Sequence, residues 1–263
     1  MLDKAALEAA STILWEHWQQ GRRLSELPLS CRPATRAEGY AVQALVEARS
    51  AFPLFGWKIA ATSKAGQMHI GVDAPLAGRL LRERVQESGI ELPLGANHMR
   101  VAEPEFAFRI GRQLAPRVKP YNVEEVLAAV DGLHPAIEVP DSRYEDFAKV
   151  GAAQLIADLA CAHRFILGPA APGSWRGTDL VEHRVVATVA GRYQREGKGA
   201  NVLGDPRVAL TWLANELSGL KIALEPGQVV TTGTCMAPLT IGPGDHVSAD
   251  FGTLGRVEVR FGD

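Results

Sequence analysis

Cysteine, aromatic residues and long apolar segments are all scarce in this chain. Its 263 residues include only three cysteines, Cys31, Cys161 and Cys235, which lie far apart and form no CxxC pair. An odd, scattered set of cysteines excludes a disulfide framework and fits a reducing compartment. No apolar run approaches the roughly 20 residues that a membrane-spanning helix needs, and the first residues lack the apolar core of a secretory signal. We therefore expect a cytoplasmic protein with no membrane partner.

An excess of charge of either sign is also missing. The chain has 28 basic and 30 acidic residues, a net charge of −2, and the two signs are interspersed. Because nucleic-acid binding needs a concentrated basic surface, we expect no nucleic-acid partner. The sequence has neither a glycine-rich phosphate-binding loop nor a dinucleotide fingerprint, so it implies no nucleotide cofactor. The hydrophobic content of 46% is enough for a full core.

The order of the expected elements indicates an α+β protein. Residues 1–54 are helical in pattern, and Thr35 and Glu38 are spaced as a helix capping box. After them, strands follow one another in runs with helices inserted, which favours α+β over a doubly wound sheet. We expect a small N-terminal helical region at 1–54 and a metal-binding catalytic domain at 55–263. The expected helices of the second region are 122–130, 146–163 and 205–218, and the expected strands are 56–62, 101–110, 134–140, 164–167, 183–191, 228–233, 246–251 and 255–261.

Three glutamates are the most informative residues of the chain. Glu103 and Glu105 are two residues apart in a strand-like segment, so both carboxylates point to one face. Glu138 lies in a second strand-like segment. Carboxylates without cysteine or histidine suit a hard cation such as Mg²⁺ or Mn²⁺. The alternative is a pair of solvated acids on an edge strand, which Pro104 would mark.

Lys58 is the second candidate for chemistry. It lies between Trp57 and Ile59 in an apolar strand-like segment, and burial would lower its pKa toward the range useful for proton transfer. The alternative is a lysine whose stem packs while its ammonium reaches water. The Gly/Thr loop at residues 231–234 ends another strand and offers hydroxyl and backbone donors to a carboxylate. Its alternative is a plain turn.

Several motifs, taken in order, resemble the 2-oxopent-4-enoate hydratase / 4-oxalocrotonate decarboxylase family of the fumarylacetoacetate-hydrolase-like superfamily. The motifs are Gly-Trp-Lys-Ile-Ala-Ala-Thr-Ser (56–63), Gly-Val-Asp-Ala-Pro (71–75), Glu-Pro-Glu-Phe-Ala-Phe (103–108), Ile-Glu-Val-Pro-Asp-Ser-Arg (137–143), Gly-Gln-Val-Val-Thr-Thr-Gly-Thr (227–234) and the segment 243–257. The resemblance implies a rolled mixed β-sandwich. It also implies a divalent metal, Mg²⁺ or Mn²⁺, on Glu103, Glu105 and Glu138, a catalytic role for Lys58, and substrate contacts from Ser63 and Thr234.

The resemblance further implies a lyase for short 2-oxo or 2-hydroxy-dienoic acids from the catabolism of aromatic rings. Hydration of a substrate such as 2-hydroxypenta-2,4-dienoate is the leading expectation. Decarboxylation of a 4-oxalocrotonate-type diacid is the alternative, and a non-catalytic partner subunit is a third reading. We expect a homo-oligomer, with association to a related enzyme of the same pathway.

Two positions depart from the family pattern. Many members carry aspartate where this chain has Leu76, and asparagine where it has Leu159, directly after Asp158. Leucine neither accepts a proton nor orients water. Hydration therefore needs another proton relay, for which His69 and Asp73 are the nearest candidates in sequence.

Overall fold

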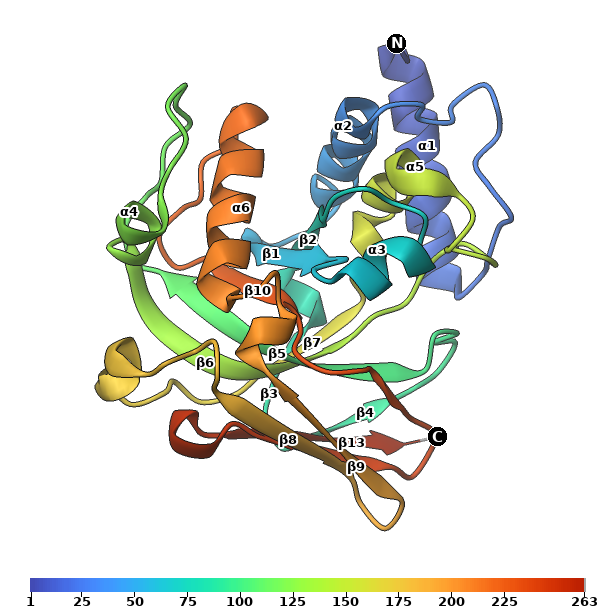
Figure 1. Cartoon of the computed structure of the whole chain (residues 1–263). Helices are drawn as coiled ribbons and strands as arrows, with labels where there is room; N and C mark the ends of the chain where they lie inside the picture. Colours follow the sequence, from blue (N-terminus) through green and yellow to red (C-terminus); the bar gives the residue numbers. More distant parts are fainter. Residues whose placement is uncertain (263) are drawn as a thin grey trace.

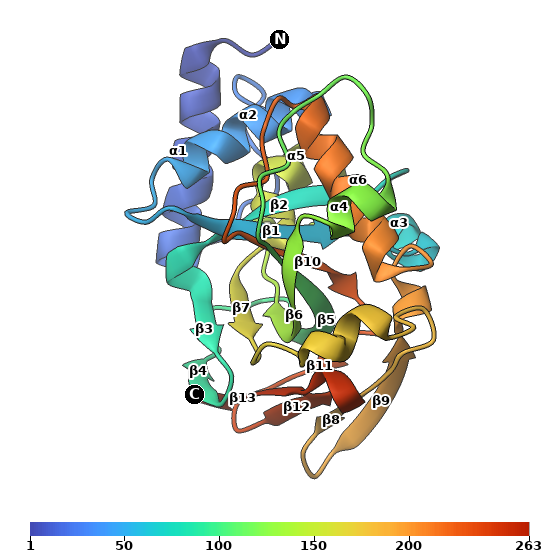
Figure 2. The same cartoon turned by 90° about the vertical axis from the view of Figure 1, so that its left-hand side faces the viewer.

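Two β-sheets lie beneath a layer of helices in the computed structural model, which describes residues 1–262 (Figure 1). The helices are α1 (Lys4–Gln20), α2 (Arg36–Glu47), α3 (Lys64–His69), α4 (Val123–Leu127), α5 (Gly151–Ala157) and α6 (Pro206–Gly219). Figure 2 shows the helices at one end of the molecule and the smaller sheet at the other. The predicted α+β class is confirmed.

The larger sheet mixes parallel and antiparallel strands. Its order is β2 (Leu76–Leu81), β1 (Leu54–Ala60), β10 (Val229–Thr234), β5 (Val101–Ile110), β6 (Val130–Val139), β7 (Arg164–Leu167) and β3 (Val85–Glu87), with β11 (Leu239–Thr240) beside β5. Strand β1 pairs in parallel with β10, so that Lys58 lies opposite Thr231. The centre of this sheet thus joins the first and the last parts of the chain.

The smaller sheet covers one face of the larger one. Its order is β4 (Ile90–Pro93), β13 (Arg256–Gly262), β12 (His246–Asp250), β8 (Arg184–Val189) and β9 (Tyr193–Lys198). The strands predicted at 246–251 and 255–261 are confirmed as β12 and β13, which pair antiparallel as a hairpin.

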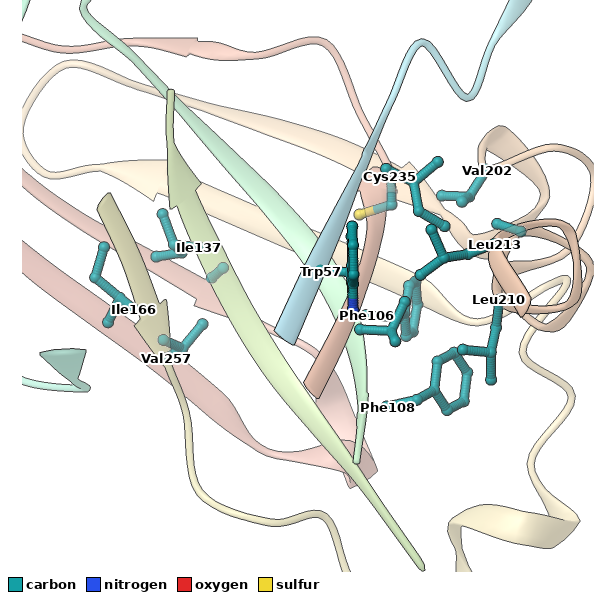
Figure 3. Close-up of a cluster of buried hydrophobic side chains, with 14 of the residues drawn as sticks. Trp57, Phe106, Phe108, Ile137, Ile166, Val202, Leu210, Leu213, Cys235 and Val257 are labelled. Atoms are coloured by element: carbon teal, nitrogen blue, oxygen red, sulfur yellow. The ribbon is translucent and has the colours of Figure 1, made fainter. Parts of the chain in front are cut away.

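The core lies on both faces of the larger sheet. Leu210 of α6 packs near Phe108 on one side, whereas Ile137 and Val257 meet between the two sheets (Figure 3). Each such side chain contributes about 1.5–3 kcal/mol by leaving water. These contacts fix β5 and β6, which carry the three glutamates.

Capping interactions mark the start of α2 and the end of α1. The Thr35 side chain accepts from the Glu38 backbone N–H, and the Glu38 side chain accepts from the Thr35 backbone, which confirms the capping box. Helix α1 ends at Gly21, whose φ of 63° suits glycine. Tyr40 of α2 belongs to the main hydrophobic core. A division of the chain between residues 54 and 55 stays a prediction.

Two predicted helices are too long. The helix predicted at 122–130 ends at Leu127, and Val130 already begins β6. The helix predicted at 146–163 contains only α5, because the chain turns into the left-handed region at Leu159. Apolar spacing alone does not reveal such a turn. The short strands β2, β3, β4, β9 and β11 were not predicted either.

None of the helices within residues 1–262 combines the length and the apolar character that a membrane crossing requires.

A partly buried histidine, His163, joins α1 to the start of β7 in the larger sheet. The Trp18 indole N–H donates to His163 Nδ1 at 2.8 Å. Burial lowers the pKa of His163 to about 2, and the nearby Arg143 and Arg84 guanidinium groups add to the effect. The imidazole is therefore neutral in the folded protein, whereas an unfolded histidine titrates near 6.5. Stability from this group is complete above pH 6.5 and is lost as the pH falls toward 2.

We expect the variant His163→Gln to flatten the acid limb of the stability curve. Glutamine keeps an acceptor for Trp18 but binds no proton. Below pH 6.5 the wild type should lose up to about 1.4 kcal/mol per pH unit relative to the variant. Urea unfolding at pH 8, 6 and 5 measures this difference. His98→Gln, the same substitution at an exposed histidine, is the control variant. Parallel curves for wild type and His163→Gln would contradict the assignment.

Candidate active site

Neighbouring strands bring the three glutamates together. Glu103 on β5 lies directly opposite Glu138 on β6, and Glu105 follows on the same face of β5. One carboxylate oxygen from each residue lies within 4.8 Å of the others. Strand β5 is an interior strand, and Glu105 and Glu138 are fully buried. The alternative of solvated acids on an edge strand is therefore wrong.

The surroundings of these carboxylates leave negative charge uncompensated. Glu105 Oε2 accepts from Thr231 Oγ1 at 2.5 Å and from the Gly233 backbone N–H at 2.7 Å. Glu105 Oε1 and Glu138 Oε2 accept no hydrogen bond from residues 1–262. Buried polar atoms without a partner are costly, so these oxygens suit a ligand.

The pKa values of the three acids express the same excess of negative charge. Burial is the main cause that raises the pKa of Glu103, and the Glu138 carboxylate is the second. Together they bring it to about 7. Burial also raises the pKa of Glu105, with Glu138 and Glu103 adding to it. For Glu138, burial raises the pKa and the Lys58 ammonium opposes the rise. A divalent cation on these oxygens would remove the repulsion, so the residues fit the metal that the sequence implied.

Lys58 is buried beside the carboxylates. Its side chain is 3% exposed, and Nζ lies 3.1 Å from Glu138 Oε1 and donates to the Ala160 carbonyl oxygen at 2.9 Å. The alternative of an ammonium in bulk water is wrong. Burial by itself would lower the pKa of Lys58, but the Glu138 and Glu103 carboxylates raise it above its usual value. The expected lowering is thus overturned by the charge of the neighbouring acids.

A left-handed backbone segment presents the Ala160 carbonyl to Lys58. Leu159, Ala160 and Cys161 have φ values of 54°, 49° and 65°, which L residues seldom adopt. The preceding Asp158 is buried and pairs with the Arg143 guanidinium, which also donates to the Ala162 carbonyl at 3.0 Å. This ion pair holds the segment in its strained conformation, as is common at functional sites.

A cavity of about 840 Å³ opens beside this cluster. Lys58 and Glu103 line it, and so do Ser63 and Thr234, the two residues that the sequence predicted as substrate contacts. The Ser63 hydroxyl accepts from the Gly66 backbone N–H at 3.0 Å, and the Thr234 hydroxyl donates to the Met236 carbonyl. The geometry therefore places every predicted site residue in or beside one cavity.

The sequence matches the family model described as fumarylacetoacetate (FAA) hydrolase C-terminal over residues 66–261. The chain belongs to the FAA hydrolase family. The 2-keto-4-pentenoate hydratase of Paraburkholderia xenovorans (strain LB400) is 30% identical to it over 97% of this chain and 94% of that protein. A 4-oxalocrotonate decarboxylase of Pseudomonas sp is 34% identical over 77% of this chain and 76% of that protein.

A solved structure of an FAA-hydrolase-type enzyme superposes over almost the whole chain. The 4-oxalocrotonate decarboxylase from Pseudomonas putida G7, complexed with magnesium and adipate, gives a TM-score of 0.90 at 27% identity and covers 99% of both chains. The same enzyme complexed with calcium and acetate gives 0.88 at 26% identity. The predicted fold of rolled mixed sheets is confirmed, and so is the resemblance to this group of lyases.

The departures from the FAA hydrolase pattern lie on the cavity wall or next to it. Leu76 is fully buried and lines the cavity, and so does His69. Asp73 is absent from the lining that residues 1–262 provide. Of the two predicted proton relays, His69 therefore lines the cavity and Asp73 does not.

The sequence did not predict the contacts that three groups make with the site residues: the Thr231 hydroxyl, the Gly233 N–H and the Ala160 carbonyl oxygen. The Gly/Thr loop was expected to donate to a bound carboxylate, but Thr231 and Gly233 donate to the protein's own Glu105. Ala160 contributes only its carbonyl oxygen, which no residue-type pattern reveals. Residues 231–234 form the end of strand β10 rather than a loop, and Gly233 within them, with a φ of 92°, was the available signal.

Gly78 on β2 is the residue that leaves room for the left-handed segment. A Cβ atom there would collide with the Leu159 carbonyl oxygen and lie 3.1 Å from Lys58 Cδ. We expect Gly78→Ala to cost about 1–3 kcal/mol and to lower turnover, since the segment and Lys58 must both move. Thermal unfolding and steady-state kinetics measure the two effects. Gly173→Ala is the control, because its Cβ would meet no atom within 4 Å. Equal behaviour of the two variants would refute the close contact.

Proposed function

We propose that this chain is a divalent-metal-dependent lyase for short 2-hydroxy-dienoic or 2-oxo-enoic acids, with addition of water as its leading reaction. The observation that carries the proposal is a buried set of three carboxylates with a buried lysine, beside a cavity. Glu103, Glu105 and Glu138 would hold Mg²⁺ or Mn²⁺. The bound cation would supply positive charge for the substrate's carboxylate and 2-oxygen while the enolate forms.

Lys58 is positioned for proton transfer. Its protonated Nζ is held between Glu138 and the Ala160 carbonyl oxygen, and Lys58 lines the cavity. The ammonium is thus a proton donor in a fixed position for a substrate carbon in the cavity. The fixed backbone acceptor orients the ammonium without competing for its proton. Ser63 and Thr234 are proposed to orient the substrate through their hydroxyl groups.

His69 is proposed as the second proton carrier. Leu76 occupies the position where related enzymes carry an aspartate, and leucine cannot move a proton. His69 lines the same cavity, and its ring packs edge-on against Phe147 at 5.8 Å between centroids. Water addition to the distal carbon then uses Lys58 and His69 rather than a carboxylate.

Decarboxylation of a 4-oxalocrotonate-type diacid is the second candidate. It is favoured by Leu76, because loss of CO₂ needs a site for the released electrons but no group that orients water. A chain that binds metal and 2-oxo acids without turnover would instead be a non-catalytic partner subunit. Homo-oligomerisation stays a prediction, which sedimentation of the purified chain tests. Association with a related enzyme also stays a prediction.

Mass spectrometry of 2-hydroxypenta-2,4-dienoate after incubation with the protein tests the proposal. With Mg²⁺ we expect the product to gain one water, and with EDTA we expect no gain. A gain of water that EDTA leaves unchanged would refute the metal requirement. If no water is added and 4-oxalocrotonate loses CO₂, the chain is the decarboxylase.

A further inference from the structure

The side chains around the cavity carry very little positive charge. Among the lining residues within 1–262, Lys58 is the one lysine or arginine, and it is already paired with Glu138. His69 is the other basic side chain, and Glu103 and Glu196 are acidic. A second carboxylate on a substrate would therefore enter a wall without a free permanent cation.

Part of the cavity wall is apolar. Its members come from the end of α3, the start of β2, α5 and two loops, and they are Ile70, Leu76, Met99, Phe147 and Leu155. Ile70, Met99 and Phe147 are only partly buried although they pack against the main core. Apolar surface that faces a cavity gains free energy when an apolar group covers it.

The size of the cavity exceeds what a five-carbon acid fills. A volume of about 840 Å³ lies in the range of sites for drug-sized ligands. The carboxylate and 2-oxygen of a 2-oxo acid account for the end near the glutamates. The apolar residues named above line part of the space that such an acid leaves unfilled.

We infer that the preferred substrate carries an uncharged hydrocarbon group at its distal end and is longer than 2-hydroxypenta-2,4-dienoate. This inference rests on the proposed function, because it assumes that the 2-oxo acid end lies at Glu103, Glu105 and Glu138. It also gives Leu76 a role, since an aspartate there would interrupt the apolar wall. Diacids are discriminated against because burial of an unpaired carboxylate is costly.

Calorimetric binding of non-reacting 2-oxo acids in the presence of Mg²⁺ tests the inference without turnover. All titrations are made at one pH, pH 8. From 2-oxopentanoate through 2-oxohexanoate to 2-oxooctanoate, the Kd should fall about fourfold per methylene group. We expect 2-oxoadipate to bind at least about tenfold more weakly than 2-oxohexanoate, which has the same number of carbons.

A charge placed on the apolar wall should reverse this preference. Ile70→Arg should strengthen 2-oxoadipate binding and weaken 2-oxooctanoate binding, each about tenfold. Met68→Arg is the matched control, because Met68 is 79% exposed, lies two residues away and does not line the cavity. Unfolding temperatures of both variants should match the wild type, which shows that the fold is kept.

The outcomes separate this inference from the proposed function. If 2-oxo acids bind but the Kd is independent of chain length, or 2-oxoadipate binds as tightly as 2-oxohexanoate, the inference is overturned and the proposed function stands. If no 2-oxo acid binds in the presence of Mg²⁺, the proposed function fails and the inference with it.

Discussion

The variant Glu105→Gln is expected to lose at least ~100-fold in affinity for Mg²⁺ while keeping its fold. The substitution removes one charged ligand and changes the volume very little. In the wild type, Thr231 Oγ1 and the Gly233 N–H donate to Glu105 Oε2. The glutamine side-chain oxygen can accept the same two hydrogen bonds. Isothermal titration with Mg²⁺ measures the affinity, and an unfolding scan in EDTA measures the fold.

The direction of the change in unfolding temperature in EDTA can also be predicted. Burial and the neighbouring acids raise the pKa of Glu105, which means that the charged form is destabilised in the folded protein. Neutral glutamine avoids this penalty, so the metal-free variant should unfold at the same temperature as the wild type or above it. Glu196→Gln is the control, since Glu196 also lines the cavity but is exposed and paired with Arg184. Unchanged Mg²⁺ affinity in Glu105→Gln would refute its assignment as a ligand.

The variant Lys58→Ala is expected to bind Mg²⁺ and to lose at least ~10²-fold in turnover, the lower limit for a general acid–base residue. Removal of the ammonium takes away a competing positive charge 3.1 Å from Glu138, so the metal affinity should not fall. Turnover on the substrate that the mass-spectrometric assay identifies gives the first number, and titration calorimetry gives the second.

Two further variants separate charge from packing at this position. Lys58→Met retains most of the buried stem, so it should show the same loss of turnover with a smaller loss of stability. Lys64→Ala removes a lysine at the start of α3 that lies outside the cavity lining, and it should leave turnover unchanged. Near-normal turnover in Lys58→Met would make Lys58 a structural residue.

Much of the fold was accessible from local pattern. Strand β5 was predicted with its observed bounds, because the alternation and the β-branched and aromatic residues from Val101 to Ile110 agree with each other. The capping box of α2 is local too. The end of α5 was not accessible, since Asp158 is held there by Arg143, a partner that only the folded chain brings near.

The candidate site likewise has features that local sequence predicts and features that only the fold determines. Glu103 and Glu105 share a face because of strand geometry, which the sequence contains. Glu138 and Lys58 were candidates from their own strand-like segments, and the family motifs implied what all four residues do. The length and polarity of the cavity were out of reach, because Ile70, Met99 and Phe147 come from three separate segments. The raised pKa of Lys58 was mispredicted for a related reason, since burial was foreseen without the three charges that outweigh it.

The parallel pairing of β1 with β10 has a consequence for biosynthesis. Lys58 gains its neighbour Thr231 only when the strand near the end of the chain has been made. Strand β5 gains its own β10 contacts at the same time, including the donors to Glu105. During synthesis on the ribosome these contacts can form only after β10 has emerged, so the candidate site is completed late.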